Sequence, residues 1–438
     1  KHKIKRGDRL EVLTLLQDML YQPSKYEKDI NWGELAKMMM EVKPTPRQKY
    51  STDPRPKPES FKIYGPENID PLAIEQMQMA MKMPLSIKGA LMPDGHVGYG
   101  LPIGGVVATY NAVMPYGVGM DIGCRMCLSV YPIKPGLIDQ RRESLKDLLI
   151  ENTRFGHAEF NDTGSHELME RKEFSEIKFL KDLQKTFYKQ LGTSGHGNHF
   201  VDIGYLEVSE RSGELDLEPG AYFSILSHSG SRNFGAQIAR HYTRIAKEKL
   251  NLEGEAAKLA WLDLDSEEGQ EYWLAMNLAG DYAKANHHII HDKLSEALAE
   301  KPLIRIENHH NFAWKEKLSK KESIIVHRKG ATPAHPGTTG IIPGSMISPA
   351  FVVSGKGSEE SINSAAHGAG RLISRRQAKK NLGRSRLIKL LKNAGVELIG
   401  GGLDESPEVY KDIFEVMEAQ RELVNVLATF YPKIVRME

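Results

Sequence analysis

The segment LSIKGALMPDGHVGYGLPIGGVVATYNAVMPYGVGMDIGCRMCLSVY, residues 85–131, consists of short apolar runs separated by glycine-rich turns. Such a pattern predicts strands joined by loops. Strand-like runs return at residues 304–314 and 323–332, after a long helix that the sequence pattern predicts at about 267–299. Because long helices and short strands are mixed without regular alternation, the sequence predicts an α+β fold rather than a doubly wound sheet.

The first 60 residues differ from the rest of the chain. Helix-like pieces at about 9–20 and 33–42 precede a proline-broken polar stretch, residues 42–60. We therefore expect an N-terminal appendage with an extended connection over residues 1–60 and one large domain over residues 61–438.

Four further elements can be predicted within the large domain. A charged helical stretch is expected at about 166–191, and apolar residues 221–228 predict a strand that leads through a loop into a helix. Another helix is predicted to open near Ser364. The sequence shows no repeat of fixed period.

The composition limits the partners and the cellular compartment that are expected for this protein. Lys and Arg total 59 against 57 for Asp and Glu, so the net charge of +2 leaves only a local patch for any polyanionic partner. Neither a membrane-spanning apolar run nor the apolar core of a signal peptide is found, so no membrane partner is expected. The two cysteines, Cys124 and Cys127, fit a reducing compartment, and we expect a cytoplasmic protein.

Asp121 and Cys124 lie in GVGMDIGCRM, where flanking glycines let the backbone turn sharply. A carboxylate and a thiolate are both competent metal ligands, although a buried free cysteine beside a turn-capping aspartate is the alternative interpretation. Cys127 completes a CxxC pattern, but CRMCLSVY predicts a strand, in which an odd separation points two side chains to opposite faces. Cys124 is therefore the predicted ligand, and Cys127 is predicted to be a core residue.

Three histidines stand beside Asn, Gly or Ser in short apolar runs: His199 in GHGNHF, His228 in LSHSGSR and His310 in ENHHNF. Imidazole is a common metal ligand, although a lone histidine in such a place is more often a hydrogen-bonded core or turn residue. A second set shares a predicted helix face: His287, His288 and His291. Because the glutamate of an HExxH motif is absent there, this set is interpreted as part of an ordinary amphipathic helix.

His367, in SAAHGAGRLISRR, is predicted at or just before a helix start, followed by small residues that let a phosphate approach the backbone. An imidazole nitrogen at this place is able to form a covalent phosphoramidate, and the alternative is a helix-terminal histidine packed among alanines. The following residues are strongly basic: Arg371, Arg375, Arg376, Lys379 and Lys380. They form either a solvated face or a track for an RNA backbone. Arg328 and Lys329 stand near glycine-rich turns that are able to cradle phosphates.

Eight segments in series carry a family resemblance: PDGHVGYGLPIGG, GVGMDIGC, GNHF, HSGSR, HHNFAW, RKGAT, IIPGSM and HGAGRLISR. From about Ile63 to the C-terminus, the chain resembles the RtcB family of GTP-dependent RNA ligases, whose segments occur in the same order. The resemblance implies a single large RtcB-like domain of mixed short strands and long helices around a central metal pocket.

The resemblance also implies roles for individual residues. Cys124 would bridge two manganese ions, with His228 and His310 completing one site and Asp121 and His199 completing the other. His367 would carry GMP from GTP. The segments matching the guanylate pocket contain Asn198, Ser345, Met346, Gly368, Ala369 and Gly370, and the implied phosphate contacts are Arg232 and Arg328.

The implied reaction joins a 2′,3′-cyclic phosphate or 3′-phosphate RNA end to a 5′-hydroxyl end through a histidine–GMP intermediate, in tRNA splicing or RNA repair. RNA and GTP are then the partners, and some family members also require a helper protein. Two alternatives remain open: a metal-dependent hydrolase that opens cyclic phosphates, and a non-catalytic RNA-binding relative.

Four features depart from the family pattern. Arg125 and Ile347 stand where glycine is usual, and Pro333 stands where arginine is common. The chain ends in PKIVRME rather than in the family's lysine–glycine pair, whose lysine contacts guanine, and Arg436 is considered as its substitute. These departures suggest a divergent branch specialised for RNA repair.

Overall fold

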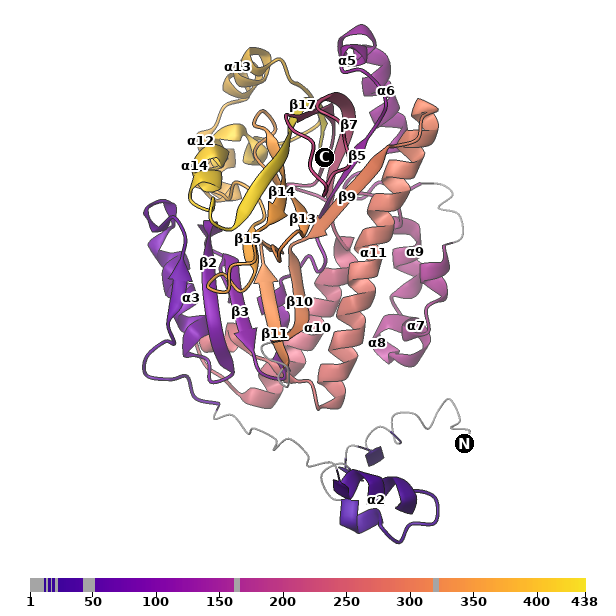
Figure 1. Ribbon diagram of the computed structural model, residues 1–438, viewed down its shortest axis with the longest axis vertical. Coiled ribbons are helices and arrows are strands. Elements are labelled where there is room, and N and C mark those ends of the chain that lie inside the picture. Colours follow the sequence, from indigo (N-terminus) through magenta and orange to yellow (C-terminus); the bar gives the residue numbers. More distant parts are fainter. Residues whose placement is uncertain are drawn as a thin grey trace.

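The computed structural model describes residues 12, 15–16, 18–19, 23–41, 52–160, 166–317 and 323–438. Most of the helix predicted at 9–20 therefore lies outside the described residues. The helix predicted at about 33–42 is confirmed as α2 (Gly33–Glu41), which follows the 3-10 turn η2 (Pro23–Tyr26). From residue 61 onward, strands and helices are mixed in one α+β body, as predicted (Figure 1).

Two main sheets form the framework. The five-stranded sheet, in which only the first pair is parallel, has the order β1 (Phe61–Ile63), β2 (Ser86–His96), β3 (Ile103–Thr109), β11 (Ser323–Lys329), β10 (Asn311–Lys317). The eight-stranded sheet has the order β13 (Thr339–Pro343), β14 (Ala350–Gly355), β17 (Val424–Arg436), β6 (Phe200–Val208), β7 (Gly220–Ser229), β5 (Arg125–Val130), β9 (Ile304–His309). Its eighth strand, β16 (Glu397–Ile399), pairs in parallel with β17.

The chain crosses from the larger sheet to the smaller one at His310, which separates β9 from β10. The backbone N–H of His310 donates to the carbonyl of Cys124 (3.0 Å), and its own carbonyl accepts from Gly330 (2.8 Å), the residue after β11. Two-stranded ladders complete the strands: β12 (Ala331–Pro333) with β15 (Ser364–Ala366), and β4 (Ala112–Val113) with β8 (Leu262–Asp263). Segments far apart in the sequence thus meet at the junction of the two sheets.

The longest helix, α11 (Glu267–Leu298), begins after the N-cap Ser266 and confirms the helix predicted at about 267–299. It packs beside α10 (Arg232–Leu250) and against β5 and β7. The other helices are α3 (Pro71–Lys82), α4 (Pro115–Val118), α5 (Gly136–Gln140), α6 (Arg142–Asn152), α12 (Arg375–Asn381), α13 (Arg384–Ala394) and α14 (Ile413–Glu418), with 3-10 turns η3 (Pro66–Asn68), η5 (Ala256–Leu259), η6 (Leu403–Glu405) and η7 (Pro407–Val409). In the described part of the chain, no helix has the length and apolar character needed to cross a membrane.

The helical stretch predicted over 166–191 is divided into four short segments: η4 (Glu167–Glu170), α7 (Glu173–Glu176), α8 (Lys178–Lys181) and α9 (Gln184–Gln190). Extended backbone at Arg171 and Ile177 interrupts the helix. Ile177 and Phe187 are buried in the same core as residues of α10 and α11, so packing overrides the local helical preference.

The prediction that a helix opens near Ser364 is wrong. Residues 364–366 form the strand β15, and α12 begins only at Arg375, after a capping box between Ser374 and Gln377. Gly370 lies in the turn between them with a φ of 73°, and a Cβ there would collide with the backbone of Asp94. Hydrogen bonding in the ladder with β12, rather than apolar periodicity, decides this segment.

Candidate metal centre and nucleotide cavity

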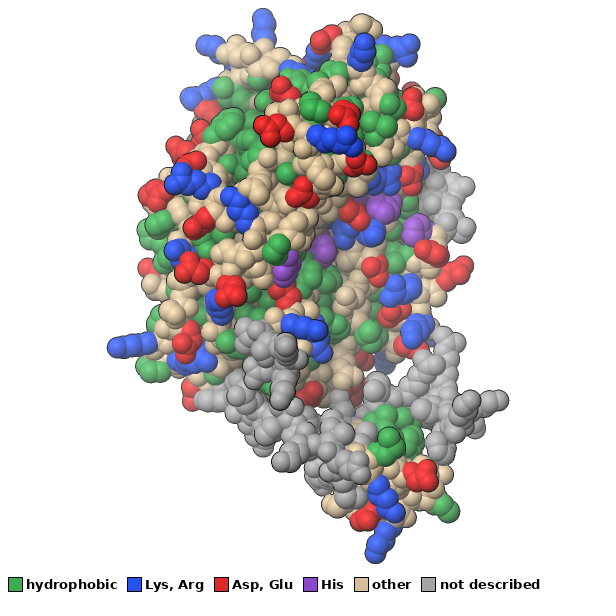
Figure 2. Space-filling model, in the orientation of Figure 1, with side chains coloured by type: hydrophobic (Ala, Val, Ile, Leu, Met, Phe, Trp, Pro, Cys, Tyr) green, Lys and Arg blue, Asp and Glu red, His purple; other side chains and the backbone are tan. Residues whose placement is uncertain are grey.

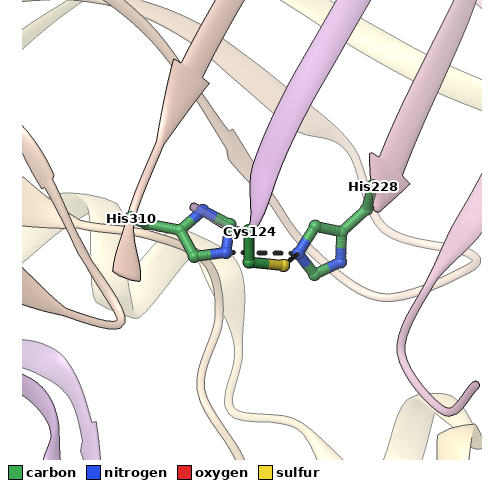
Figure 3. Close-up of side chains that lie close together, drawn as sticks. All are labelled: Cys124, His228 and His310. Atoms are coloured by element: carbon green, nitrogen blue, oxygen red, sulfur yellow. Dashed lines mark hydrogen bonds between the residues drawn. The ribbon is translucent and has the colours of Figure 1, made fainter. Parts of the chain in front are cut away.

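Cys124, His228 and His310 meet at the junction of the two sheets (Figure 3). Cys124 precedes β5, His228 lies near the end of β7 and His310 follows β9, so three adjacent strands present the three side chains. Cys124 Sγ lies 3.2 Å from His228 Nε2, which lies 3.2 Å from His310 Nε2. All three side chains are buried, so predicted ligands from distant parts of the sequence converge on one point.

A hydrogen bond fixes which nitrogen of His228 carries the proton. Its Nδ1 lies 2.9 Å from the carbonyl oxygen of Asn198, which can only accept, so Nδ1 donates and Nε2 keeps its lone pair. That lone pair faces the sulfur of Cys124 and the ring of His310. A carbonyl that orients a histidine in this way is the usual outer partner of a metal-binding imidazole, and the donor set fits a divalent cation.

Asp121 and His199 form a second group with the same cysteine. His199 Nε2 lies 2.9 Å from Asp121 Oδ2 and 3.5 Å from Cys124 Sγ. The other carboxylate oxygen of Asp121 accepts from the backbone N–H of Ser231 (3.0 Å), which holds the carboxylate in place. Since Cys124 belongs to both groups, the five predicted ligands form one continuous cluster with the sulfur in the middle.

Burial has the largest single influence on the pKa values of Cys124, His228 and Asp121. It raises the pKa of the Cys124 thiol well above its usual value and lowers the pKa of His228 to about 3. Burial alone would raise the pKa of Asp121 as well, but the hydrogen bonds and charges contributed by His199, Cys124 and His228 together outweigh it, and the pKa is lowered overall. Neutral imidazoles beside a neutral thiol suit a site in which a cation displaces the thiol proton on binding.

His367 lies beside this cluster, with its ring centroid 4.8 Å from that of His310. Asp94, at the end of β2, is buried, and its Oδ2 accepts from the backbone N–H of His367 (3.2 Å) and lies 2.5 Å from Nδ1. An ionised carboxylate can only accept, so Nδ1 carries the proton and Nε2 keeps a free lone pair. Sequence reasoning used the PDGH segment without singling out Asp94, although a carboxylate within a glycine-rich turn was the available signal.

One cavity borders both His367 and His228. Its lining contains most of the residues predicted to contact the nucleotide: Asn198, Ser345, Met346, His367, Gly368, Ala369 and Gly370. Asp202, three residues after His199, also lines the cavity, and sequence reasoning missed it. Burial raises the pKa of Asp202 well above its usual value, and its Oδ1 has no partner among the described residues, so this carboxyl is available to a ligand.

The arginines predicted to contact phosphate are not part of this lining. Arg232 opens α10, and its Nη2 lies 2.5 Å from the carbonyl oxygen of Gly156. Arg436 donates to the carbonyl of Leu149, and the neighbouring Met437 lines the cavity instead. The apolar side chain of Met437 therefore faces the cavity, where Arg436 was considered as the substitute for the family's lysine.

Arg328 is bound inside the core, which argues against the predicted phosphate contact. Its side chain is 0% exposed and donates to Glu316 (2.6 Å), Ser364 Oγ (2.7 Å) and the carbonyl of Ile362 (2.9 Å). Ile362 has a φ of 54°, which a β-branched residue rarely adopts. Arg328 therefore holds a strained turn immediately before β15, the strand that leads to His367.

Replacing Arg328 with alanine is expected to lower the free energy of unfolding by about 3–5 kcal/mol. Glu316 then loses its nearest cation and keeps His335, while the buried Ser364 hydroxyl and the carbonyl of Ile362 each lose a donor. Denaturant unfolding measures this change. The matched control is Arg211→Ala, which removes an arginine that is 61% exposed and pairs with Asp216 and Glu218 at the surface. We expect about 1 kcal/mol or less there, and equal effects of the two substitutions would contradict a structural role for Arg328.

Cys127, His287 and His291 form a separate buried group between β5 and α11. His287 Nε2 donates to the carbonyl of Ser229 (3.0 Å), and its Nδ1 accepts from the hydroxyl of Ser227 (2.6 Å). That hydroxyl accepts from His291 Nε2 (2.8 Å), whose Nδ1 accepts from a serine hydroxyl on β5 (2.8 Å). One set of proton positions satisfies all four ring nitrogens, which supports the interpretation of both histidines as hydrogen-bonded core residues.

An α+β fold that gathers a thiol, a carboxylate and three imidazoles beside a cavity with a further histidine defines a metal-binding enzyme. The family described as tRNA-splicing ligase RtcB matches residues 76–180 and 169–438, and the chain belongs to this family.

Three curated relatives align with this chain over most of their length. RNA-splicing ligase RtcB of Escherichia coli (strain K12) is 32% identical over 389 residues, which cover 82% of this chain and 92% of that protein. tRNA-splicing ligase RtcB of Nanoarchaeum equitans is 32% identical over 417 residues, covering 79% and 87%. tRNA-splicing ligase RtcB of Thermococcus kodakarensis is 30% identical over 414 residues, covering 78% and 86%.

Proposed function

We propose that the protein is a GTP-dependent RNA ligase that joins a 2′,3′-cyclic phosphate or 3′-phosphate end to a 5′-hydroxyl end, through GMP carried on His367. The main support is the position of His367 in the cavity, between the carboxylate of Asp94 and the ring of His310. We also propose that residues 61–438 form the catalytic domain and residues 1–60 its appendage.

The first step is the transfer of GMP to the protein. Nε2 of His367 attacks the α-phosphorus of GTP, a P–N bond forms, and pyrophosphate leaves with the electrons of the broken P–O bond. Positive charge develops on the imidazole during this attack. Asp94, which accepts from Nδ1, stabilises that charge and keeps the ring in the reactive tautomer.

Two manganese ions are proposed for the two ligand groups, Cys124 with His228 and His310, and Cys124 with Asp121 and His199. When bound, they supply positive charge to the phosphoryl oxygens during transfer. The thiolate would also suit zinc, so metal analysis of protein prepared without chelator decides between the two.

The second and third steps use the RNA ends. An oxygen of the 3′-phosphate, formed from a cyclic phosphate by hydrolysis where necessary, attacks the GMP phosphorus, and His367 leaves as neutral imidazole. The 5′-hydroxyl oxygen then attacks the activated RNA phosphorus, a phosphodiester forms, and GMP is released. The first two transfers occur at the GMP phosphorus and the third at the RNA phosphorus joined to it through one oxygen, so a single cavity beside the metal ligands is proposed to serve all three steps.

Asp202 is the proposed contact to the guanine base. Its carboxyl is buried in the cavity wall, one of its oxygens has no hydrogen-bond partner within the described part of the chain, and guanine offers two adjacent N–H donors on its Watson–Crick edge. A carboxylate that accepts both would be ionised by the ligand although burial disfavours its charge. Adenine lacks this pair of donors, so the contact would favour GTP over ATP.

Asp94→Ala is expected to slow the attachment of labelled GMP by about 10²–10⁴-fold, because the variant loses both the ring orientation and the charge that stabilises the imidazolium. Metal content should stay as in the wild type, since Asp94 is not among the ligand groups. Single-turnover labelling with GTP measures the rate. An unchanged rate would remove Asp94 from the proposed mechanism.

Incubation of the protein with RNA halves of defined end chemistry, each nucleoside triphosphate and manganese tests the function as a whole. Joined product that requires GTP supports the ligase. Accumulation of 3′-phosphate ends without any joined product would favour the cyclic-phosphate hydrolase, and RNA binding without reaction would favour a non-catalytic relative. Adding a candidate helper protein to the same assay tests the proposed need for activation.

A further inference from the structure

A patch of aromatic and basic side chains lies outside the cavity lining. We call it the tyrosine platform and define it as Tyr99, Tyr116, Arg240, Lys247 and Lys258. On the face shown in Figure 2, cationic and anionic side chains are interspersed, so an RNA-binding region has to be a local feature of this kind. Tyr99 is 47% exposed, and its ring meets that of the partly exposed Tyr116 edge-on, with centroids 4.8 Å apart.

Basic side chains lie close to these two rings, and the charge of Arg240 acts on the phenol of Tyr116. The ammonium of Lys247 lies 5.9 Å from the ring centre of Tyr99 and 5.8 Å from that of Tyr116, and Lys258 lies 5.3 Å from Tyr99. Lys258 pairs with Glu255, whereas Arg240 and Lys247 form no ion pair with a carboxylate in the described part of the chain. The platform thus combines aromatic surface with positive charge that the protein itself does not neutralise.

Tyr99 is joined to the reacting centre by a short route. Its carbonyl accepts from Lys329 Nζ (2.5 Å), and the next residue along from Lys329 is Gly330. A Cβ on Gly330 would lie 3.1 Å from Cε1 of His367. One lysine side chain therefore spans the distance between the platform and the neighbourhood of the proposed nucleophile.

Tyr116 is linked to the metal centre along the backbone. It lies on α4, five residues before the ligand Asp121, so the two Cα atoms are at most about 18 Å apart. Helix α10 begins at Arg232, directly after the loop that follows His228, and leads to Arg240 and Lys247. The route through Lys329 places Tyr99 near the site, and α10 connects the site to Lys247, about 22 Å further along the helix.

A second groove that adjoins the cavity is less suited to a polyanion. It shares His96, Arg371 and Arg375 with the cavity. Its acidic residues are Glu67, Asp70, Asp412 and Glu415. The two arginines are already paired with Glu405. Phosphates leaving the cavity on that side would meet carboxylates, whereas on the side of Tyr99 they meet unpaired cations.

We propose that the tyrosine platform binds the single-stranded nucleotides next to a reacting RNA end, with a base stacked on Tyr99 and phosphates held by Arg240 and Lys247. The proposal deepens the proposed function and rests on RNA being the substrate. Aromatic rings and cations together are the usual means by which proteins hold single strands without reading their sequence. The platform would therefore contribute affinity for many RNA sequences.

The test is the binding of a fluorescent RNA of about ten nucleotides to the full chain with manganese, followed by anisotropy. One RNA carries a 3′-phosphate and a second carries a 5′-hydroxyl. The RNA whose affinity falls when Tyr99 is replaced identifies the kind of end next to which the platform binds. Tyr99→Ala is expected to weaken binding by about 5- to 150-fold, the range for one stacked base, and Tyr99→Phe should retain affinity. Lys247→Ala should reduce the slope of log K against log salt by about 0.7.

Tyr205→Ala is the matched control, because Tyr205 also contacts a second tyrosine, Tyr431 (5.1 Å between ring centroids), and lies near Lys433 (5.7 Å). Melting temperatures verify that the variants are folded. Equal affinity of Tyr99→Ala and wild type for both RNAs, or an equal loss in Tyr205→Ala, would overturn the platform. A wild type that binds RNA through Tyr99 but never attaches GMP would contradict the proposed function and leave the platform standing.

Discussion

Replacement of Cys124 by alanine should remove bound metal and reduce the attachment of GMP to background. The sulfur belongs to both ligand groups, 3.2 Å from His228 Nε2 and 3.5 Å from His199 Nε2, so its loss removes a donor from each. Loss of an outer partner of a metal ligand weakens affinity by about 10–100-fold, and loss of a shared ligand should exceed that. Metal content after gel filtration and labelling with GTP measure the two effects.

Cys127→Ala is the matched control, since Cys127 is equally buried but lies on the other side of β5. We expect it to retain metal and GMP labelling, with only a packing loss in stability. Retention of the full wild-type metal content in Cys124→Ala would contradict the shared-ligand role. Equal loss in both cysteine variants would indicate a general folding defect instead.

The sequence predicted those parts of the site that depend on local geometry. Cys124 stands directly before β5 and Cys127 three residues later within it, and the structure places them in two different groups, as predicted from the alternation of side chains. The helix that bears His287 and His291 was predicted from its length and pattern, and its histidines were interpreted as core residues. The family resemblance then supplied the pairing of Asp121 with His199, which no spacing rule yields.

The parts that could not be predicted depend on contacts between distant segments. Asp94 becomes recognisable only once β2 ends beside His367, which is 273 residues away in the sequence. Arg328 looked available for phosphate because it stands next to glycines, yet the five-stranded sheet buries it against the turn at Ile362. A helix was predicted to open near Ser364, whereas pairing with β12 makes this residue part of a strand.

His367→Ala is expected to abolish the covalent attachment of GMP completely while bound metal is retained. The substitution removes the only proposed nucleophile but none of the five ligands, so it separates the two roles that Cys124→Ala removes together. The label on the wild type should be released by acid and survive base, because a P–N bond on imidazole is acid-labile. Mass spectrometry of the intact protein after incubation with GTP and manganese measures the attachment.

A second histidine tests whether the effect belongs to this position. His241, on α10, stacks on Phe179 with ring centroids 3.9 Å apart. The variant His241→Ala should be labelled like the wild type. Labelling of His367→Ala at the wild-type level would show that another group carries GMP. Loss of metal in that variant would instead mean that His367, whose ring lies 4.8 Å from that of His310, belongs to the ligand set, and the proposed chemistry would need a different nucleophile.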